Sequence, residues 1–261
     1  MPELELTERQ QTALIIKQYI EQHGVDEGAL EDMLGLCYQA EEAGEVDVDF
    51  EHRDWWMGMC KYIRTKAMYK NIETSETVYG QYYEKFLLFE SKYLFLSFIL
   101  YMEKNRPYEK RFYEPRRMTL HVVVQDLQDL EDGKYTFYGL SMPPRVGKST
   151  ICIFFLAWVM CKRPDSHSAM GGHSGILAKG FYKELLNLIT SEEYCFAELY
   201  ERMQPGLTML RDKSADEFTI TLGHSDRFAT VTCRGIDGTW TGAVDISGIG
   251  GYLYVDDLIR L

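Results

Sequence analysis

The sequence predicts an α/β protein in which a mainly parallel sheet is flanked by helices and preceded by a helical N-terminal region. Residues 1–103 show helical spacing of apolar residues and no strand alternation. Residues 104–261 alternate short apolar runs with amphipathic patterns, which indicates strand–helix–strand units. A glycine–lysine loop lies between one predicted strand and the next predicted helix. We therefore expect a helical domain over 1–103 and an α/β domain over 104–261.

Composition limits the classes of partner. The 261 residues are 46% hydrophobic, which is enough for a substantial core. The formal charge of −12 is concentrated in residues 1–50, which hold 13 acidic and 2 basic residues. This argues against a nucleic-acid-binding surface over the whole chain but leaves room for a local basic groove. The longest apolar runs, 93–102 and 151–161, are shorter than the ~18 residues of a membrane span, so no membrane contact is expected.

Local signals divide the chain into elements. Thr7 followed by Gln10 is a capping-box pattern, and Gly24 and Gly44 should end the first two helices. The six cysteines lack C-x-x-C spacing, so we expect reduced, buried thiols. The further elements expected are one or two helices over 76–104, a basic aromatic segment over 104–117, helices over 118–133, 150–163 and 175–191, and strands over 135–142, 166–174, 217–222, 228–235 and 252–257.

The loop SMPPRVGKST, Ser141 to Thr150, predicts a phosphate site. Its end matches the consensus G-x-x-x-x-G-K-[ST] of nucleotide-binding loops, but Met142 stands where the first glycine belongs. Pro143 and Pro144 can offset that loss because they fix the backbone. A chance match at a strand–helix turn is the alternative interpretation.

The other loop residues have expected roles. Gly147 lets the backbone approach the phosphates, Lys148 reaches the β- and γ-phosphates, and Ser149 offers its hydroxyl to Mg²⁺. Thr150 can donate to an inner phosphate, and Arg145 can fold over the γ-phosphate. The nucleotide-binding loop residues expected are Pro144, Arg145, Val146, Gly147, Lys148, Ser149 and Thr150.

A second motif supports the first. The apolar run YLYVDD ends in Asp256 and Asp257, and Asp256 comes 108 residues after Lys148. Asp256 is expected to hold Mg²⁺, and Asp257 stands where related ATPases place a glutamate that polarises the attacking water. An ordinary acidic turn is the alternative. The two motifs together predict a P-loop NTPase of the ASCE type (additional strand, catalytic glutamate) with ATP and Mg²⁺ as cofactors.

These motifs resemble the large subunit of terminases, the DNA-packaging proteins of tailed phages and prophages. The resemblance rests on PPRVGKST, GGHS, TCRGIDGTWTGAVDISGIGGYLYVDD and the lead-in YEPRR…LQDLEDGK, over about residues 110–261. It implies an ATP-driven motor that moves double-stranded DNA into a procapsid, in the cytoplasm of a bacterial host. It also implies a homo-oligomeric ring of about five subunits, with a small terminase subunit and a portal protein as partners. By this resemblance a coupling motif and a nuclease domain would follow Leu261, so the chain is expected to be truncated.

Some positions depart from the family pattern. Asp257 is one methylene shorter than the usual glutamate. The segment 241–244 lacks the family's arginine, so Arg234 becomes the candidate for an arginine that reaches a neighbour's ATP; a loop-pinning arginine is the alternative. The resemblance places 112–117 against adenine, with Arg116 as a contact; a basic linker or a DNA-phosphate contact are the alternatives. The expected catalytic residues are Asp257, Arg145 and Arg234, and the expected metal ligands are Ser149 and Asp256.

Two other functions stay open at this stage. One is a nucleotide-binding remnant without ATP turnover. The other is a P-loop kinase, which the double acid and the lack of an acceptor lid make the weaker candidate.

Overall fold

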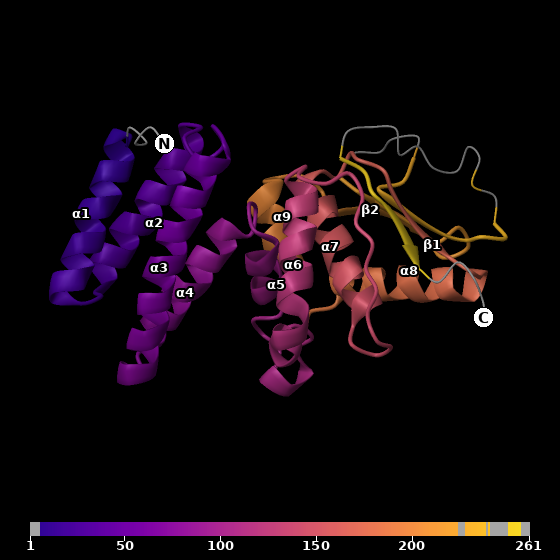
Figure 1. The fold of residues 1–261 in the computed structure, drawn as a ribbon, viewed down its shortest axis with the longest axis horizontal. Coiled ribbons are helices and arrows are strands. Elements are labelled where there is room, and N and C mark those ends of the chain that lie inside the picture. The colour runs from indigo at the N-terminus through magenta and orange to yellow at the C-terminus, as the bar shows by residue number, and fades with distance from the viewer. Residues whose placement is uncertain (1–5, 224–227, 239, 241–249, 257–261) are drawn as a thin grey trace. The chain divides into compact units, whose positions relative to one another are not determined.

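The chain forms two compact units, residues 1–93 and 94–261, and each is described by itself (Figure 1). The computed structural model describes residues 6–223, 228–238, 240 and 250–256. The sequence predicts this boundary later, between residues 103 and 104. The helix over 95–102 instead packs within the second unit. There the ring of Phe95 stacks on Trp158, and the backbone N–H of Phe95 donates to Gln128 Oε1 at 2.8 Å.

The first unit is helical, as its apolar spacing predicts. Thr7 forms the expected capping box with Gln10, and Gly24 ends the first helix with a φ of 86°. Two buried side chains, Arg64 and Glu90, form an ion pair at 2.8 Å inside the unit. Its helices are α1 (Glu8–His23), α2 (Glu27–Glu42), α3 (Phe50–Thr74) and α4 (Thr77–Glu90).

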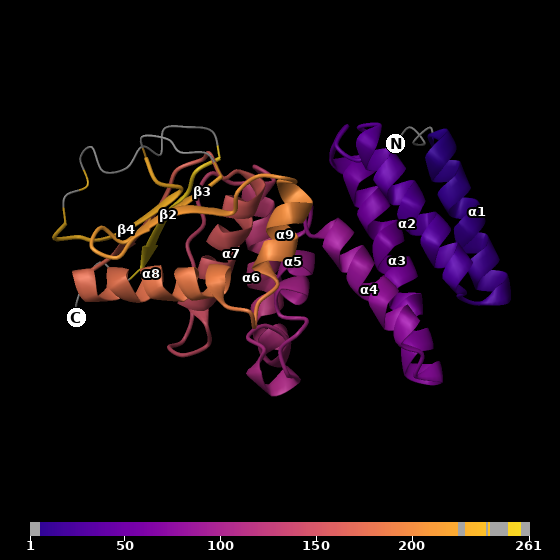
Figure 2. The same cartoon turned by 180° about the vertical axis from the view of Figure 1, so that it is seen from behind.

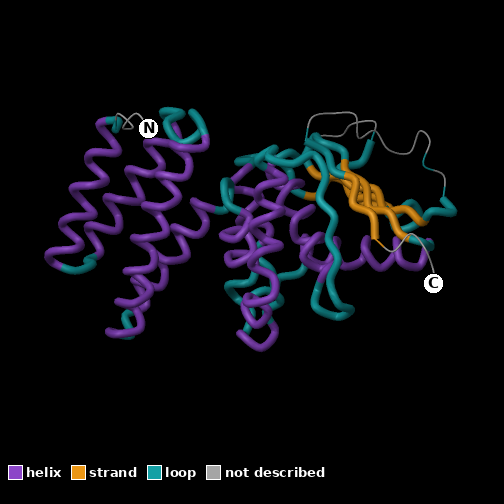
Figure 3. Tube along the Cα trace, viewed as in Figure 1, coloured by secondary structure: helices purple, strands orange, loops and turns teal. Residues whose placement is uncertain are grey.

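The second unit combines helices with a sheet (Figure 3). Helix α7 is buried along its length from Ile151 to Cys161, which explains the apolar run read from the sequence. Helix α8 lies across β1, β3 and β4 (Figure 1, Figure 2). Its helices are α5 (Phe95–Met102), α6 (Arg117–Glu131), α7 (Lys148–Lys162), α8 (Gly175–Thr190) and α9 (Phe196–Met203), with 3₁₀ turns at Tyr108–Lys110 and Glu114–Arg116.

Over the described residues the sheet has five strands, in the order β2-β3-β4-β1-β5. Strand β1 (Ser168–Gly172) is parallel to both β4 (Val231–Gly235) and β5 (Leu253–Asp256). Strands β2 (Leu210–Ser214) and β3 (Thr219–Leu222) pair antiparallel, and β3 is antiparallel to β4. The sheet is therefore mixed rather than mainly parallel, because a hairpin-like pair extends the parallel core. Gly172 lies opposite both Gly235 and Asp256, so the three parallel strands end at the same level.

The prediction of a strand over 135–142 is wrong. This segment has irregular backbone and is drawn as loop in Figure 3. A cavity of about 670 Å³, lined by residues 136–140 and 251–256 among others, lies between the segment and β5. An apolar run becomes a strand only when a neighbouring strand accepts its hydrogen bonds. Here Phe137 is 83% exposed, and Tyr138 hydrogen-bonds to Asp126 on α6 instead.

A buried ionic cluster joins α6, α7 and the start of β5. Glu131 accepts hydrogen bonds from Lys162 at 2.7 Å, from Arg163 at 2.6 and 2.8 Å, and from the Tyr252 hydroxyl at 2.9 Å. Burial alone would raise the pKa of Glu131, but the hydrogen bonds and charges of Arg163 and Lys162 outweigh burial and lower it to about 2. The cluster fixes the point where the chain enters β5.

Two expectations from composition concern cysteines and membranes. All six cysteines are buried and unbridged, as expected. Among the described residues, no helix has the length and apolarity that a bilayer crossing requires.

Candidate nucleotide-binding site

Helix α7 begins at Lys148, directly after the loop that the sequence singled out. Its N-cap is Gly147, with a φ of 101° that favours glycine, and no side chain of the described residues caps the helix. The first N–H groups of a helix lack partners within the helix and carry the positive end of its dipole. An anion at the start of α7 could therefore accept hydrogen bonds from backbone N–H groups that the N-cap residue, a glycine, does not cap.

The two motifs meet in space as the sequence predicts. Lys148 Nζ lies 2.7 Å from Asp256 Oδ1, and Ser149 Oγ donates to Asp256 Oδ2 at 2.5 Å. Asp256 closes β5, and its side chain is only 4% exposed. Strand β5 runs parallel to β1, so Asp256 lies at the carboxyl end of the parallel strands, next to the start of α7.

The charge state of Asp256 follows from these contacts. Burial would raise the pKa of Asp256, but the hydrogen bonds from Lys148 and Ser149 outweigh burial and lower it. Asp256 is thus a carboxylate at neutral pH, held between a cation and a hydroxyl.

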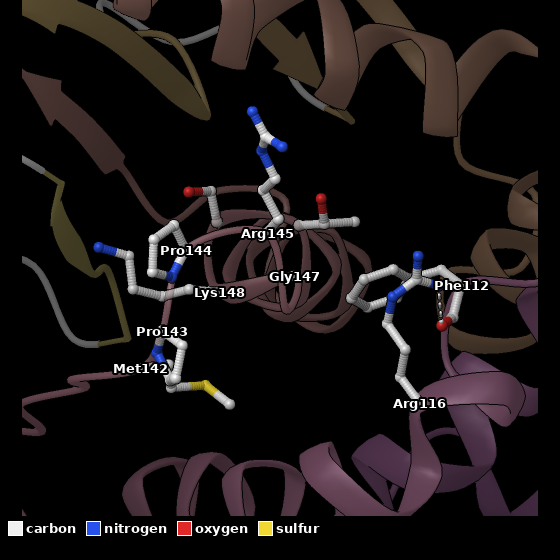
Figure 4. Close-up of a pocket in the computed structure, with 10 residues that line it drawn as sticks. Phe112, Arg116, Met142, Pro143, Pro144, Arg145, Gly147 and Lys148 are labelled. Atoms are coloured by element: carbon white, nitrogen blue, oxygen red, sulfur yellow. Dashed lines mark hydrogen bonds between the residues drawn. The ribbon is translucent and has the colours of Figure 1, made fainter.

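A cavity of about 580 Å³ opens beside the loop (Figure 4). Lys148 and Arg145 extend from the loop in different directions, while Phe112 and Arg116 form the opposite side. Among the residues that the structure describes, the lining is mostly cationic or apolar and includes no carboxylate. The residues that line it are Phe112, Arg116, Met142, Pro143, Pro144, Arg145, Gly147, Lys148, Ser149 and Thr150.

Arg145 adopts an unusual backbone conformation. Its φ of 66° lies in the left-handed region, which costs a non-glycine residue roughly 1 kcal/mol or more. The side chain lines the cavity, as expected for a loop arginine. Thr150 also lines it, but its hydroxyl donates to Glu184 Oε1 on α8 at 2.9 Å. Sequence reasoning missed Glu184, because nothing in the spacing of α8 marks this contact.

Phe112 packs directly on the loop. A Cβ added at Gly147 would lie 2.5 Å from Phe112 Cε2, so only glycine fits beneath this ring. The other partner of the ring is Phe154 on α7, with ring centroids 5.5 Å apart and planes 17° from parallel. The guanidinium of Arg116 lies 5.4 Å from the ring centroid of Phe112, and its Nη1 donates to the Phe112 carbonyl at 3.0 Å.

Two expected residues, Val146 and Arg234, are not among the residues that line the cavity, and the position of a third is not described. Val146 belongs to the loop but is not among the cavity-lining residues. Arg234 lies on β4 and does not line the cavity, and its buried Nε has no hydrogen-bond partner within the described part of the chain. Asp257 lies outside the described residues, so its role stays a prediction.

The oxygens present suit a Mg²⁺ ion that arrives with a nucleotide. Ser149 and Asp256 bring a hydroxyl and a carboxylate together within 2.5 Å. No group of three or more His, Cys, Asp or Glu residues able to hold a metal occurs among the described residues. Mg²⁺ prefers oxygen ligands and keeps several waters or phosphate oxygens, so two protein oxygens are a sufficient share.

Comparisons with family models, with curated proteins and with solved structures find no match to this chain.

Proposed function

We propose that the second unit binds ATP in the cavity at the start of α7 and hydrolyses it. The observation that carries the proposal is the convergence of Lys148, Ser149 and Asp256 at an uncapped helix start beside a cavity of about 580 Å³. A cation, open backbone donors and oxygen ligands for a divalent cation are what a polyphosphate chain requires.

The residues divide the work of binding. The α7 N-terminus and Lys148 would hold the phosphates, and Arg145 would add a second cation at the mouth of the loop. Lys148 is paired with Asp256 in this structure, so nucleotide binding exchanges that carboxylate for phosphate oxygens. Mg²⁺ held by Ser149 and Asp256 would neutralise phosphate charge. Phe112 and Arg116 would receive the base.

The finer parts of the proposal rest on the resemblance to terminase large subunits. They are attack by a water that Asp257 orients, and Arg234 acting on a neighbouring subunit's ATP. Coupling to double-stranded DNA, a ring of subunits, a small terminase subunit and a portal protein are proposals of the same origin. The P-loop motif and the cavity support the nucleotide part of this proposal, and the terminase motifs support the packaging part.

The test is DNA-stimulated ATP hydrolysis by the parent protein and by Lys148→Ala. We expect the variant to lose ATP binding and turnover, because the phosphates lose their principal side-chain cation. Lys179→Ala, which removes an exposed lysine from α8, is the matched control and should behave as the parent. Full-rate hydrolysis by Lys148→Ala would refute the site. Tight ATP binding by the parent without turnover would favour the nucleotide-binding alternative.

A further inference from the structure

Phe112 sits at a place where the backbone has little support of its own. It lies between two short 3₁₀ turns, Tyr108–Lys110 and Glu114–Arg116, and not within a helix or strand. Its ring nevertheless closes one side of the nucleotide cavity and touches Gly147. A ring in such a segment keeps its place only if other groups fix both its backbone and its side chain.

The backbone is fixed by Glu103, the residue that ends α5. Glu103 Oε1 and Oε2 accept the Phe112 N–H at 2.7 and 3.0 Å, and Oε2 also accepts the Tyr113 N–H at 3.1 Å. Glu103 is only 2% exposed and does not line the cavity. A buried carboxylate is costly unless its oxygens are hydrogen-bonded, so these N–H groups and Glu103 hold each other in place.

The Glu103 carboxylate is also connected to the ring of Phe112, through Arg106, Tyr194 and Phe154. Arg106 Nη1 donates to Glu103 Oε1 at 3.1 Å and also to the hydroxyl of Tyr194. The Tyr194 ring meets the edge of Phe154 at 6.1 Å between centroids, and Phe154 stacks on Phe112. Glu103 thus holds Phe112 in two ways: directly, by hydrogen bonds to its backbone, and indirectly, through the packing of its ring.

We propose that Glu103 is a positioning residue for the base end of the nucleotide cavity. It fixes Phe112 so that this ring, together with Arg116, receives the base of a nucleoside triphosphate. The inference rests on the proposed function and adds that different residues control the affinity for the base and for the phosphates. Glu103 controls affinity for the base, whereas Lys148 controls affinity for the phosphates.

The test compares ATP with inorganic tripolyphosphate, which has the phosphates but no base. Binding of each to the full chain is measured by calorimetry in the presence of Mg²⁺. Removing a stacking ring costs about 10-fold in affinity or more. We therefore expect Phe112→Ala and Glu103→Ala to weaken ATP binding by about 10-fold. Both should leave tripolyphosphate binding within about twofold of the parent, because the phosphate-binding residues are unchanged.

Two further variants separate positioning from a general structural role. Glu103→Gln keeps one amide oxygen for the Phe112 N–H, so its ATP affinity should fall between those of the parent and Glu103→Ala. Glu109→Gln removes an exposed carboxylate that precedes this segment, and should change neither affinity. If Glu103→Ala does not fold, the ratio of ATP to tripolyphosphate affinity in Glu103→Gln decides.

The outcomes are distinct. An equal loss of ATP and tripolyphosphate binding in the Glu103 variants, or unchanged ATP binding in them, overturns the positioning role. Loss of ATP binding alone supports it. Failure of the parent to bind either ligand overturns the proposed function itself and this inference with it.

Discussion

Replacing Asp256 by asparagine should release Lys148 for a nucleotide that carries no metal. In the structure the lysine is engaged by Asp256 at 2.7 Å, and Ser149 donates to the same carboxylate. A polyphosphate must therefore compete with Asp256 for Lys148. Asparagine has nearly the same shape but no charge, so the competitor weakens while the packing is kept.

The magnitude follows from the nature of this contact. A hydrogen bond between charged groups contributes about 1.5–3 kcal/mol net. The pair lies near the upper part of that range, because Asp256 is 4% exposed and Lys148 28% exposed. At about 1.4 kcal/mol per tenfold, metal-free ATP should bind roughly 10- to 100-fold more tightly to Asp256→Asn. Removal of a negative charge beside the phosphates acts in the same direction.

The assay is calorimetric titration with ATP, first with a chelator and then with Mg²⁺. With Mg²⁺ the gain should disappear and hydrolysis should be lost, because a carboxylate ligand of the cation is gone. Asp129→Asn is the matched control. It also breaks an Asp–Lys pair, with Lys134 at 2.8 Å, but on α6 and away from the cavity. A folded Asp256→Asn protein that binds metal-free ATP no more tightly than the parent would refute the reasoning.

Two other substitutions test the loop and the core. In Gly147→Ala the new Cβ would meet Phe112 Cε2 at 2.5 Å in a residue with a φ of 101°, so ATP affinity should fall at least about tenfold. Gly139→Ala, whose Cβ would meet a Phe137 atom at 3.5 Å, should bind as the parent does, and parent-like binding by Gly147→Ala would contradict the observed contact. Glu131 has a pKa of about 2 against an ordinary 4.5, so its contribution, on the order of 3 kcal/mol, is present above about pH 4.5 and lost as the pH falls towards 2. Urea unfolding should show that Glu131→Gln is less stable than the parent at neutral pH and lacks this part of the acid-induced loss; identical pH slopes for both proteins would argue against it.

The sequence predicts best those elements that carry their own local signals. The capping box at Thr7 and the apolar run of α7 both give helices where expected. The strands β1 and β5 follow from short apolar runs bounded by glycines or aspartates. Strand β2 was missed, because LRDKS is polar and largely exposed and shows no apolar alternation.

The segment 135–142 shows the limit of such reasoning. Its composition is that of a buried strand, but whether a strand forms depends on a partner that is distant in sequence. In the structure a cavity lies between this segment and β5. The boundary between the units was displaced for a related reason, because α5 is assigned by its packing on Gln128 and Trp158 and not by its own sequence.

The candidate site divides in the same way. The pairing of Lys148 with Asp256 follows from two motifs whose roles are known from nucleotide chemistry. The contact of Phe112 with Gly147 and the hydrogen bond from Thr150 to Glu184 do not follow from any motif. They are tertiary contacts between residues that no local pattern connects.

The outer side of β5 has a consequence for the behaviour of the protein at high concentration. Within the described residues β5 pairs only with β1, and Leu253 and Val255 are 51% and 42% exposed. A strand that is paired on one side and carries half-exposed apolar side chains can act as a template for another chain, so we expect edge-to-edge association in concentrated samples. The strand at risk also carries Asp256. Association at this edge would therefore also affect the proposed nucleotide site, and ATP affinity is best measured on dilute samples.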